Sequence, residues 1–301
     1  MGTPCLYVCG LRYEIIMAKQ SVRRGLTRRQ FLKLGGAAVA VGVIGATGSM
    51  AAANEITDLS LERISIPIPG LPPAFEGFTI AQLTDIHLLP YTRPAFIRKA
   101  VALANSLNPD LTVLTGDYVW RDAGAMAELA PIIGALNARH GVYGILGNHD
   151  YWLDVDVVTR GFRQTRIPLL INQHIPIARG DASIILAGLD DGWAGHADLD
   201  ATLDGAPSGA PVILLLHEPD LADEPEINTR CDLQLAGHSH GGQVRIPGRG
   251  APVLPYLGRK YDMGLYRVND MWLYTNRGLG EISVPLRINC PPEVTLFTLT
   301  R

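Results

Sequence analysis

The chain has 301 residues, of which 47% are hydrophobic and 18% are charged, and its formal net charge is −3. This composition excludes a disordered chain, and it predicts one large domain of about 250 folded residues after allowance for a leader. No uncharged run in the body of the chain is long enough to predict a membrane span.

The first 53 residues are basic, whereas the rest of the chain is acidic. They hold seven of the 26 Lys and Arg residues and one of the 29 acidic residues, which leaves residues 54–301 with a net charge of −9. Phosphate backbones bind proteins through clustered basic charge, so this balance disfavours nucleic acid as a partner. A phosphate-bearing substrate would have to be held by metal ions rather than by a basic surface.

Residues 1–53 are predicted to be a leader that precedes a single domain over residues 54–301. The segment 27–33, which contains the adjacent Arg28 and Arg29 and also Lys33, is followed by an apolar stretch rich in Gly and Ala and then by three alanines at 51–53. This order resembles a twin-arginine export signal. We expect export by the twin-arginine machinery to the periplasm or to the outer face of the cytoplasmic membrane, where an uncleaved leader would act as an anchor. Met17 is an alternative start.

Apolar runs and helical patterns alternate along the domain. An edge strand is predicted at 61–68 and helices at 94–107, 123–136 and 155–164. Further strands are predicted at 78–83, 111–114, 142–146, 169–171, 175–178, 183–189, 212–216, 233–235, 272–275 and 294–299. In the first part of the domain strands alternate with helices, and in the second part strands follow one another. This order predicts an α/β sandwich with a mixed sheet. Cys231 and Cys290, beyond the leader, are either a disulfide or two buried thiols.

Short motifs of histidine with aspartate or asparagine each follow an apolar run, at Asp85-Ile86-His87, Gly116-Asp117, Gly147-Asn148-His149-Asp150, His217 and Gly237-His238-Ser239-His240. The carboxyl ends of strands in an open α/β sheet form the crevice where ligands bind. Imidazole nitrogens with carboxylate or amide oxygens, and no thiolate, suit two divalent ions side by side. Each residue alone has a simpler explanation, as a core histidine, helix N-cap or turn residue, and only the combination predicts a metal centre.

The ordered set of motifs closely resembles the calcineurin-like metallophosphoesterases over residues 78–242. The resemblance implies a four-layer α-β-β-α sandwich with mixed β-sheets and a phosphohydrolase that activates water with two ions. It also implies that His149 is catalytic, as a general acid or as a group that stabilises transition-state charge. The ions would be Mn, Fe, Zn or Co. The implied ligands are Asp85, His87 and His240 for one ion, Asn148, His217 and His238 for the other, and Asp117 between them.

One position departs from the protein-phosphatase branch of this family. That branch has a second aspartate in the Gly-Asp motif, which orients the catalytic histidine, whereas this chain has Trp120 there. A protein phosphatase is therefore not expected. Asp150 or Asp122 is the candidate to orient His149 instead.

The C-terminal third resembles exported bacterial phosphoesterases related to UDP-2,3-diacylglucosamine pyrophosphatases, at residues 243–247, 261–266, 276–280 and 290–294. This implies a phosphodiesterase or pyrophosphatase acting at a membrane surface on a glycolipid or nucleotide-sugar type substrate. Arg277 and Arg121 are the candidate substrate-binding residues, although the loop of Arg277 also fits a simple turn. The apolar residues nearby either seat acyl chains or belong to the core: Leu254, Tyr256, Leu257 and Tyr261.

Two other functions fit the same motifs. One is a phosphate-scavenging phosphomonoesterase or nucleotidase. The other is a metal-dependent binding scaffold without turnover, which the intact ligand set together with His149 disfavours.

Overall fold

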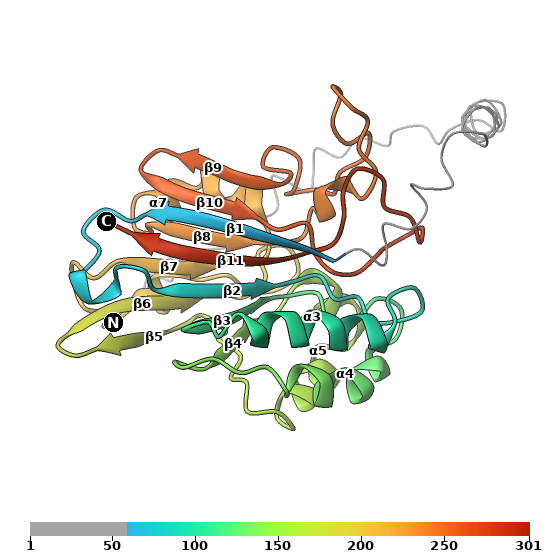
Figure 1. Cartoon of the computed structure of the whole chain (residues 1–301), viewed down its shortest axis with the longest axis horizontal. Helices are drawn as coiled ribbons and strands as arrows, with labels where there is room; N and C mark the ends of the chain where they lie inside the picture. Colours follow the sequence, from blue (N-terminus) through green and yellow to red (C-terminus); the bar gives the residue numbers. More distant parts are fainter. Residues whose placement is uncertain (1–58) are drawn as a thin grey trace, which may run out of the picture. The chain divides into compact units, whose positions relative to one another are not determined.

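The computed structural model describes residues 59–301, in which two β-sheets pack face to face (Figure 1). The first sheet has the order β1-β11-β2-β3-β4, and the second has the order β5-β6-β7-β8-β10-β9. The predictions for the leader, its cleavage and the start at Met17 lie outside the described residues. The strands of the first sheet are β1 (Ser60–Pro67), β11 (Glu293–Thr300), β2 (Thr79–Leu83), β3 (Leu111–Thr115) and β4 (Val142–Ile145). Those of the second are β5 (Gln173–Arg179), β6 (Ala182–Gly188), β7 (Val212–Leu215), β8 (Leu233–Ala236), β10 (Met271–Thr275) and β9 (Gly264–Val268).

Both sheets are mixed, as predicted. Strands β2, β3 and β4 run parallel, and β11 enters antiparallel to β2 with β1 parallel beside it. In the second sheet β6, β7, β8 and β10 run parallel, and the edge strands β5 and β9 run antiparallel to them. The central strands are buried on both faces, which explains their continuous apolar sequences.

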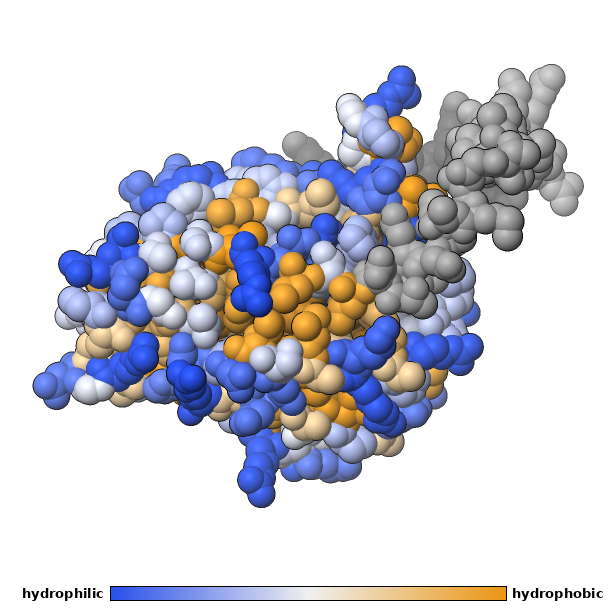
Figure 2. Space-filling view, viewed as in Figure 1, coloured by the Kyte–Doolittle hydropathy of each residue, from blue (hydrophilic) through white to orange (hydrophobic). Residues whose placement is uncertain are grey.

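Helices cover the outer faces of the sheets. Helices α3 (Pro94–Ser106), α4 (Met126–Ile133) and α5 (Asn148–Phe162) pack together on the first sheet, where they bury one apolar cluster (Figure 1). A second cluster fills the space between the sheets, and a third lies under the short helices α6 (Leu199–Leu203) and α7 (Pro225–Asn228) on the second sheet. This arrangement confirms the four-layer α-β-β-α sandwich. The cover is incomplete, since apolar side chains gather at the surface between β1 and α3 (Figure 2).

Several predicted elements differ from those observed. Helix α5 begins at Asn148, because the Asp150 carboxylate accepts a hydrogen bond from the backbone N–H of Gly147 at 3.0 Å and caps the first turn. The helix predicted at 155–164 corresponds to the part of α5 that follows a break at Asp154, whose carboxylate accepts the N–H of Val157 at 3.0 Å. The strand predicted at 169–171 is wrong, since only one isolated bridge joins Leu169 to Gly144 there. Strand β9 was not predicted, because its alternating exposed residues resemble a loop.

Two further observations concern cysteines and membrane spans. The thiols of Cys231 and Cys290 are separate and buried in residues 59–301, so the disulfide alternative is wrong for them. None of the helices formed by these residues has the length and apolar character needed to cross a membrane.

Candidate metal centre and active site

The predicted motifs meet where the two sheets present the carboxyl ends of their strands to each other. Asp85 follows β2 and Asp117 follows β3 in one sheet, and His217 follows β7 and His238 follows β8 in the other. Gln82 joins the sheets directly beneath, because its Nε2 donates to Thr115 Oγ1 at 2.8 Å and to the carbonyl of Ala236 at 3.0 Å. The packing of two sheets therefore assembles residues that lie far apart in the sequence.

One group of buried ligand atoms consists of Asp85, His87 and His240. His240 Nε2 lies 3.2 Å from Asp85 Oδ1 and 3.0 Å from His87 Nε2. Ligand atoms around one small ion lie about as far apart as these two imidazole nitrogens and this carboxylate oxygen do. These are the three residues predicted for the first ion.

A second group consists of Asp117, His217 and His238, whose ligand atoms lie within 4.8 Å of one another. Asp117 Oδ2 is 3.2 Å from His217 Nε2 and 3.4 Å from His87 Nε2, so the same carboxylate oxygen faces both groups. Asn148 Oδ1 is buried without a hydrogen-bond partner among the described residues. The placement agrees with a central Asp117, and the assignment of each residue to an ion stays a prediction.

The far nitrogens of three of these histidine rings face backbone carbonyls. His217 Nδ1 lies 2.6 Å from the carbonyl of Thr115, His87 Nδ1 lies 3.2 Å from that of Val119, and His238 Nε2 lies 2.7 Å from that of Tyr256. A carbonyl accepts a hydrogen bond, so the ring nitrogen that faces it carries the hydrogen, and the other nitrogen has its lone pair aimed at the centre. Metal-binding histidines have this arrangement.

The backbone at the centre is strained. Five of the seven predicted ligands have a positive φ, between 43° and 69°: Asp85, His87, Asp117, His238 and His240. Such a conformation costs a non-glycine residue roughly 1–3 kcal/mol, and it persists where the surrounding structure or a ligand offsets the cost. The glycines in the motifs serve close approach, because a Cβ on Gly147 would overlap Asp117 and one on Gly237 would overlap Asp85.

The charges of the centre compensate one another. Burial opposes the ionisation of Asp85, but His240 and His217 outweigh it and hold the pKa of Asp85 below its usual range. Burial likewise opposes the charge of Asp117, whose pKa His217 and His149 lower. Burial would lower the pKa of His217, yet Asp117 and Asp85 raise it above the ordinary value. A proton on His217 thus offsets part of the charge of the two buried carboxylates, and a bound cation would serve the same purpose.

These features together fit two metal ions: mixed nitrogen and oxygen donors, an orphaned amide oxygen on Asn148, and two buried carboxylates that need positive charge. We therefore expect that dialysis against a chelator lowers the melting temperature and that Mn²⁺ or Zn²⁺ restores it. Free metal at a hundredfold excess over its Kd would stabilise the fold by about 2.7 kcal/mol. The ligands must lose their protons first, so the gain should shrink as the pH falls. Thermal unfolding at pH 5.5 and 7.5 measures both effects, and equal melting temperatures with and without metal would contradict them.

His149 lies in the first turn of α5 at the edge of the centre. Its backbone N–H donates to Asp117 Oδ1 at 2.9 Å, and its ring lies between those of Trp120 and Trp152, at centroid distances of 4.8 and 4.9 Å. Burial lowers the pKa of His149 although Asp117 opposes it, so the neutral ring is favoured near pH 7. A neutral imidazole donates one hydrogen bond, which suits a leaving-group oxygen.

Neither aspartate that was expected to orient His149 contacts its ring. The Asp150 carboxylate accepts backbone N–H bonds from Asp117, Tyr118 and Gly147, and that of Asp122 accepts the N–H of Gly124. The hypothesis that Asp150 or Asp122 orients His149 is wrong, because both carboxylates accept hydrogen bonds from backbone N–H groups instead. Aromatic packing against Trp120 and Trp152 positions the ring instead.

The two candidate substrate-binding arginines differ in their surroundings. The Arg277 guanidinium pairs with Glu62 and with Glu293 and is mostly buried. It would have to leave two carboxylates to contact a phosphate, so the turn interpretation of its loop has the stronger support. Arg121 is exposed, bonds the hydroxyl of Tyr91 at 3.2 Å and makes no salt bridge among the described residues. Its role in binding stays a prediction.

Sequence reasoning missed the buried Arg287 behind His240. Its Nη2 donates to the carbonyls of Arg277 and Gly280, at 2.9 and 2.5 Å, and lies 3.5 Å from His240 Nδ1. This guanidinium ties the 277–290 segment around the centre. Arg287 lies between apolar residues with no motif around it, so nothing in the sequence distinguished it from a surface arginine.

Exposed aromatic side chains border the centre on one side. The Trp152 ring contacts that of His149 at 4.9 Å and that of Trp193 at 4.6 Å, and Trp193 lies 5.4 Å from Tyr256 and 5.8 Å from His238. Trp152, Trp193 and Tyr256, here called the aromatic rim, are 51%, 37% and 50% exposed. Flat apolar rings at the edge of a polar centre are suited to stack on a planar or sugar ring. Trp152 lies on α5 and the other two aromatic residues lie in loops, so no sequence pattern links them into such a rim.

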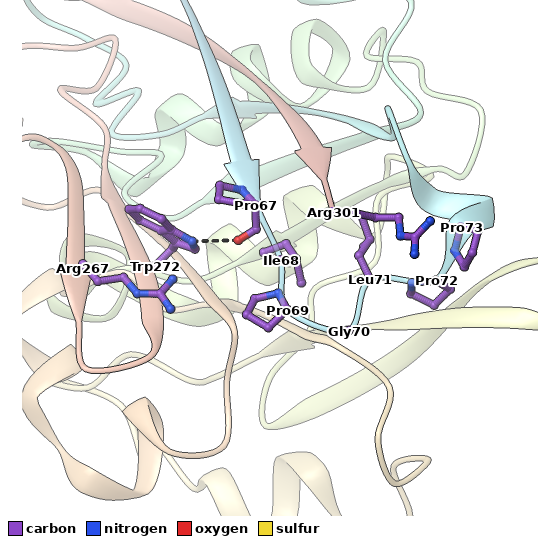
Figure 3. A pocket seen from close by; sticks show the side chains of 10 residues that line it. All are labelled: Pro67, Ile68, Pro69, Gly70, Leu71, Pro72, Pro73, Arg267, Trp272 and Arg301. Atoms are coloured by element: carbon purple, nitrogen blue, oxygen red, sulfur yellow. Dashed lines mark hydrogen bonds between the residues drawn. The ribbon is translucent and has the colours of Figure 1, made fainter.

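A cavity of about 680 Å³ lies at the other end of the sheets, where β1 and β11 finish and β10 begins (Figure 3). Trp272 Nε1 donates to the carbonyl of Pro67 there at 2.8 Å, and Arg267 lies over the Trp272 ring. Its lining contains neither histidine nor acidic residues. The candidate active site is therefore at the opposite strand ends, which carry the predicted ligands. The cavity of about 680 Å³ is larger than a cavity of about 490 Å³ that lies next to those ligands.

Comparison with known proteins agrees with the geometry. The model of a family described as calcineurin-like phosphoesterase matches residues 78–242. The chain is 34% identical to the uncharacterized metallophosphoesterase YkuE of Bacillus subtilis over 284 residues, which cover 91% of this chain and 98% of that protein. It is 32% identical to the phosphodiesterase YaeI of Escherichia coli, over 74% of this chain and 82% of that protein. It is 31% identical to a transmembrane protein with metallophosphoesterase domain of Danio rerio, over 94% of this chain and 65% of that protein.

Proposed function

Because the chain belongs to the calcineurin-like phosphoesterase family, we propose that it hydrolyses a phosphodiester or pyrophosphate bond with the help of two metal ions. The observation that carries this proposal is the pair of buried ligand groups that share Asp117. A binding scaffold does not need His149 beside those groups. Hydrolysis uses such a residue, because a hydrogen bond or a proton stabilises the charge that develops on a poor leaving group.

The residues of the centre have separate roles in this proposal. Asp85, His87 and His240 would hold one ion, Asn148, His217 and His238 would hold the other, and Asp117 would contribute to both. The ions would supply Lewis acidity and a water of lowered pKa. The backbone carbonyls of Thr115, Val119 and Tyr256 keep the ligand rings in the required tautomer. His149 donates a hydrogen bond to the oxygen that leaves.

The proposed substrate is a glycolipid or a nucleotide sugar similar to UDP-2,3-diacylglucosamine. The name of the E. coli relative, a phosphodiesterase, supports a diester over a monoester. The aromatic rim supports a substrate with a sugar or base ring next to the cleaved bond. We also propose that residues 1–53 direct export and that residues 54–301 act outside the cytoplasm at a membrane surface, as the twin-arginine pattern predicts.

Hydrolysis of bis-p-nitrophenyl phosphate against p-nitrophenyl phosphate by the metal-loaded full chain tests the reaction class. We expect the diester to be the better substrate, because the E. coli relative at 32% identity is named a phosphodiesterase. Preference for the monoester would support a scavenging phosphatase or nucleotidase. If two metals are bound and neither ester is cleaved, the protein is a binding scaffold or acts only on its own substrate, and cleavage of UDP-2,3-diacylglucosamine distinguishes these.

A further inference from the structure

A second cavity, of about 490 Å³, lies next to the metal centre and shares His240 with it. Its volume is in the range of small-molecule sites. Apart from His240 its lining has no ionisable side chain, and most of it is apolar. The lining residues are Ser239, His240, Gly242, Gln243, Val244, Pro252, Val253, Leu254, Pro255, Ile282, Ser283 and Val284.

The walls of this cavity are held together before any ligand binds. Gln243 joins the two segments that form them, because its Nε2 donates to the carbonyl of Ile282 at 2.9 Å and its Oε1 accepts the Ile282 N–H at 2.6 Å. Gly242 lets residues 251–254 approach closely, since a Cβ there would overlap Ala251. A preformed cavity loses little conformational freedom when it is filled.

Two of the polar side chains in the lining already have partners. The Gln243 amide makes the bonds just described, and the Ser239 hydroxyl donates to the carbonyl of Asp262 at 2.6 Å and accepts the N–H of Gly241. Apart from His240, the remaining polar side chain is that of Ser283, which is exposed. With valine, leucine, isoleucine and proline making up most of the lining, the cavity is suited to an apolar group.

Apolar side chains at its mouth are exposed to water. Val253 is 75% exposed and Val284 is 51% exposed, and Ile246 and Leu286 lie exposed on the same two segments. Large apolar side chains that gather around a cavity mark a binding site for something apolar. Tyr261, which the sequence also offered for this purpose, is in the core of the second sheet instead.

We propose that this cavity binds a hydrocarbon chain of the phosphoester substrate, so that the substrate is an amphiphile whose phosphate lies at the metal centre. This inference rests on the proposed function. The occupant follows from the position of His240, which belongs both to the metal centre and to the cavity lining. A molecule with a phosphate at one end and an alkyl chain at the other can place the phosphate at the metal centre and the chain in the cavity. Each buried methylene should then strengthen binding roughly threefold to fourfold.

The test is a series of p-nitrophenyl alkyl phosphate diesters with methyl, butyl, hexyl and octyl chains, all below their micelle concentrations. We expect kcat/KM of the metal-loaded full chain to rise by roughly threefold per methylene until the cavity is full, mainly through KM. Val253→Asp and Val284→Asp should each remove most of the rise and leave the methyl ester unchanged. Leu265→Asp, an exposed leucine on β9 outside the cavity lining, is the matched control and should keep the full rise.

The outcomes separate this inference from the proposed function. A methyl ester that is cleaved as fast as the octyl ester overturns the hydrocarbon site and leaves the phosphodiesterase intact. A rise that survives both aspartate variants also overturns it, because the chain then binds elsewhere. If no ester is cleaved, as by a binding scaffold or by an enzyme that acts only on its own substrate, calorimetry with butyl and octyl phosphate still decides the inference. Octyl phosphate that binds no tighter than butyl phosphate would end it.

Discussion

Asp117→Asn is expected to lower kcat by at least about a thousandfold and to reduce the metal content of the protein. The Asp117 carboxylate faces both ligand groups through one oxygen and accepts the backbone N–H of His149 through the other. Asparagine keeps the size of the side chain but removes its charge. The loss of several kcal/mol of charge stabilisation corresponds to about three powers of ten in rate, at 1.36 kcal/mol for each. Turnover of bis-p-nitrophenyl phosphate and metal analysis of the purified variant measure the two effects.

Asp122→Asn is the matched control. This carboxylate lies five residues further along the same loop, is exposed, and accepts only the N–H of Gly124. It should keep both metals, nearly full activity and its stability, because asparagine caps a helix about as well as aspartate does. If Asp117→Asn retained two metals and wild-type turnover, the central role of Asp117 and the two-ion proposal with it would be wrong.

His149→Asn is expected to lower kcat by roughly a hundredfold to a thousandfold while both metals stay bound. The side chain is at the edge of the centre, held by Trp120 and Trp152, and it is not among the predicted ligands. A group that stabilises the leaving oxygen matters more when that oxygen is a poor leaving group. The decrease should therefore be larger for phenyl esters than for p-nitrophenyl esters of the same phosphate, and a plot of log kcat against the leaving-group pKa should be steeper in the variant.

Two measurements distinguish catalysis from mere structure in that experiment. His196→Asn, at an exposed histidine, should leave the rate and the leaving-group dependence unchanged. Metal content decides the alternative in which His149 is a ligand, since its ring nitrogen also lies within 4.8 Å of ligand atoms of His87 and Asp117. Full turnover with two metals bound would show that His149 has no catalytic role, whereas loss of a metal would make it a ligand.

The aromatic positioning of His149 distinguishes this centre from one that uses a charged partner. A second aspartate would raise the pKa of the histidine and favour its protonated form. Trp120 supplies no charge, and burial lowers the pKa of His149 instead. The lowered pKa agrees with a role as a neutral hydrogen-bond donor.

The sequence by itself determined the order of the main strands, the residues that follow them and the chemistry of those residues. Buried parallel strands are continuous apolar runs, so their ends were visible, and ligands such as Asp85, Asp117 and His217 come directly after those ends. Local pattern also determined α3, because its apolar residues recur with the period of a helix. These properties depend on neighbours along the chain.

Only the tertiary structure decided what those residues contact. Helix α5 begins at Asn148 because Asp150 also accepts backbone N–H groups of Asp117 and Tyr118 from a different loop. The same holds for the pairing of Arg277 with Glu62, for the position of Arg287 behind His240 and for the cavity between residues 242–255 and 282–284. Each of these contacts joins segments that the packing of the sheets brings together. No local sequence pattern encodes such contacts, because the free energy that selects them comes from burial across the whole domain.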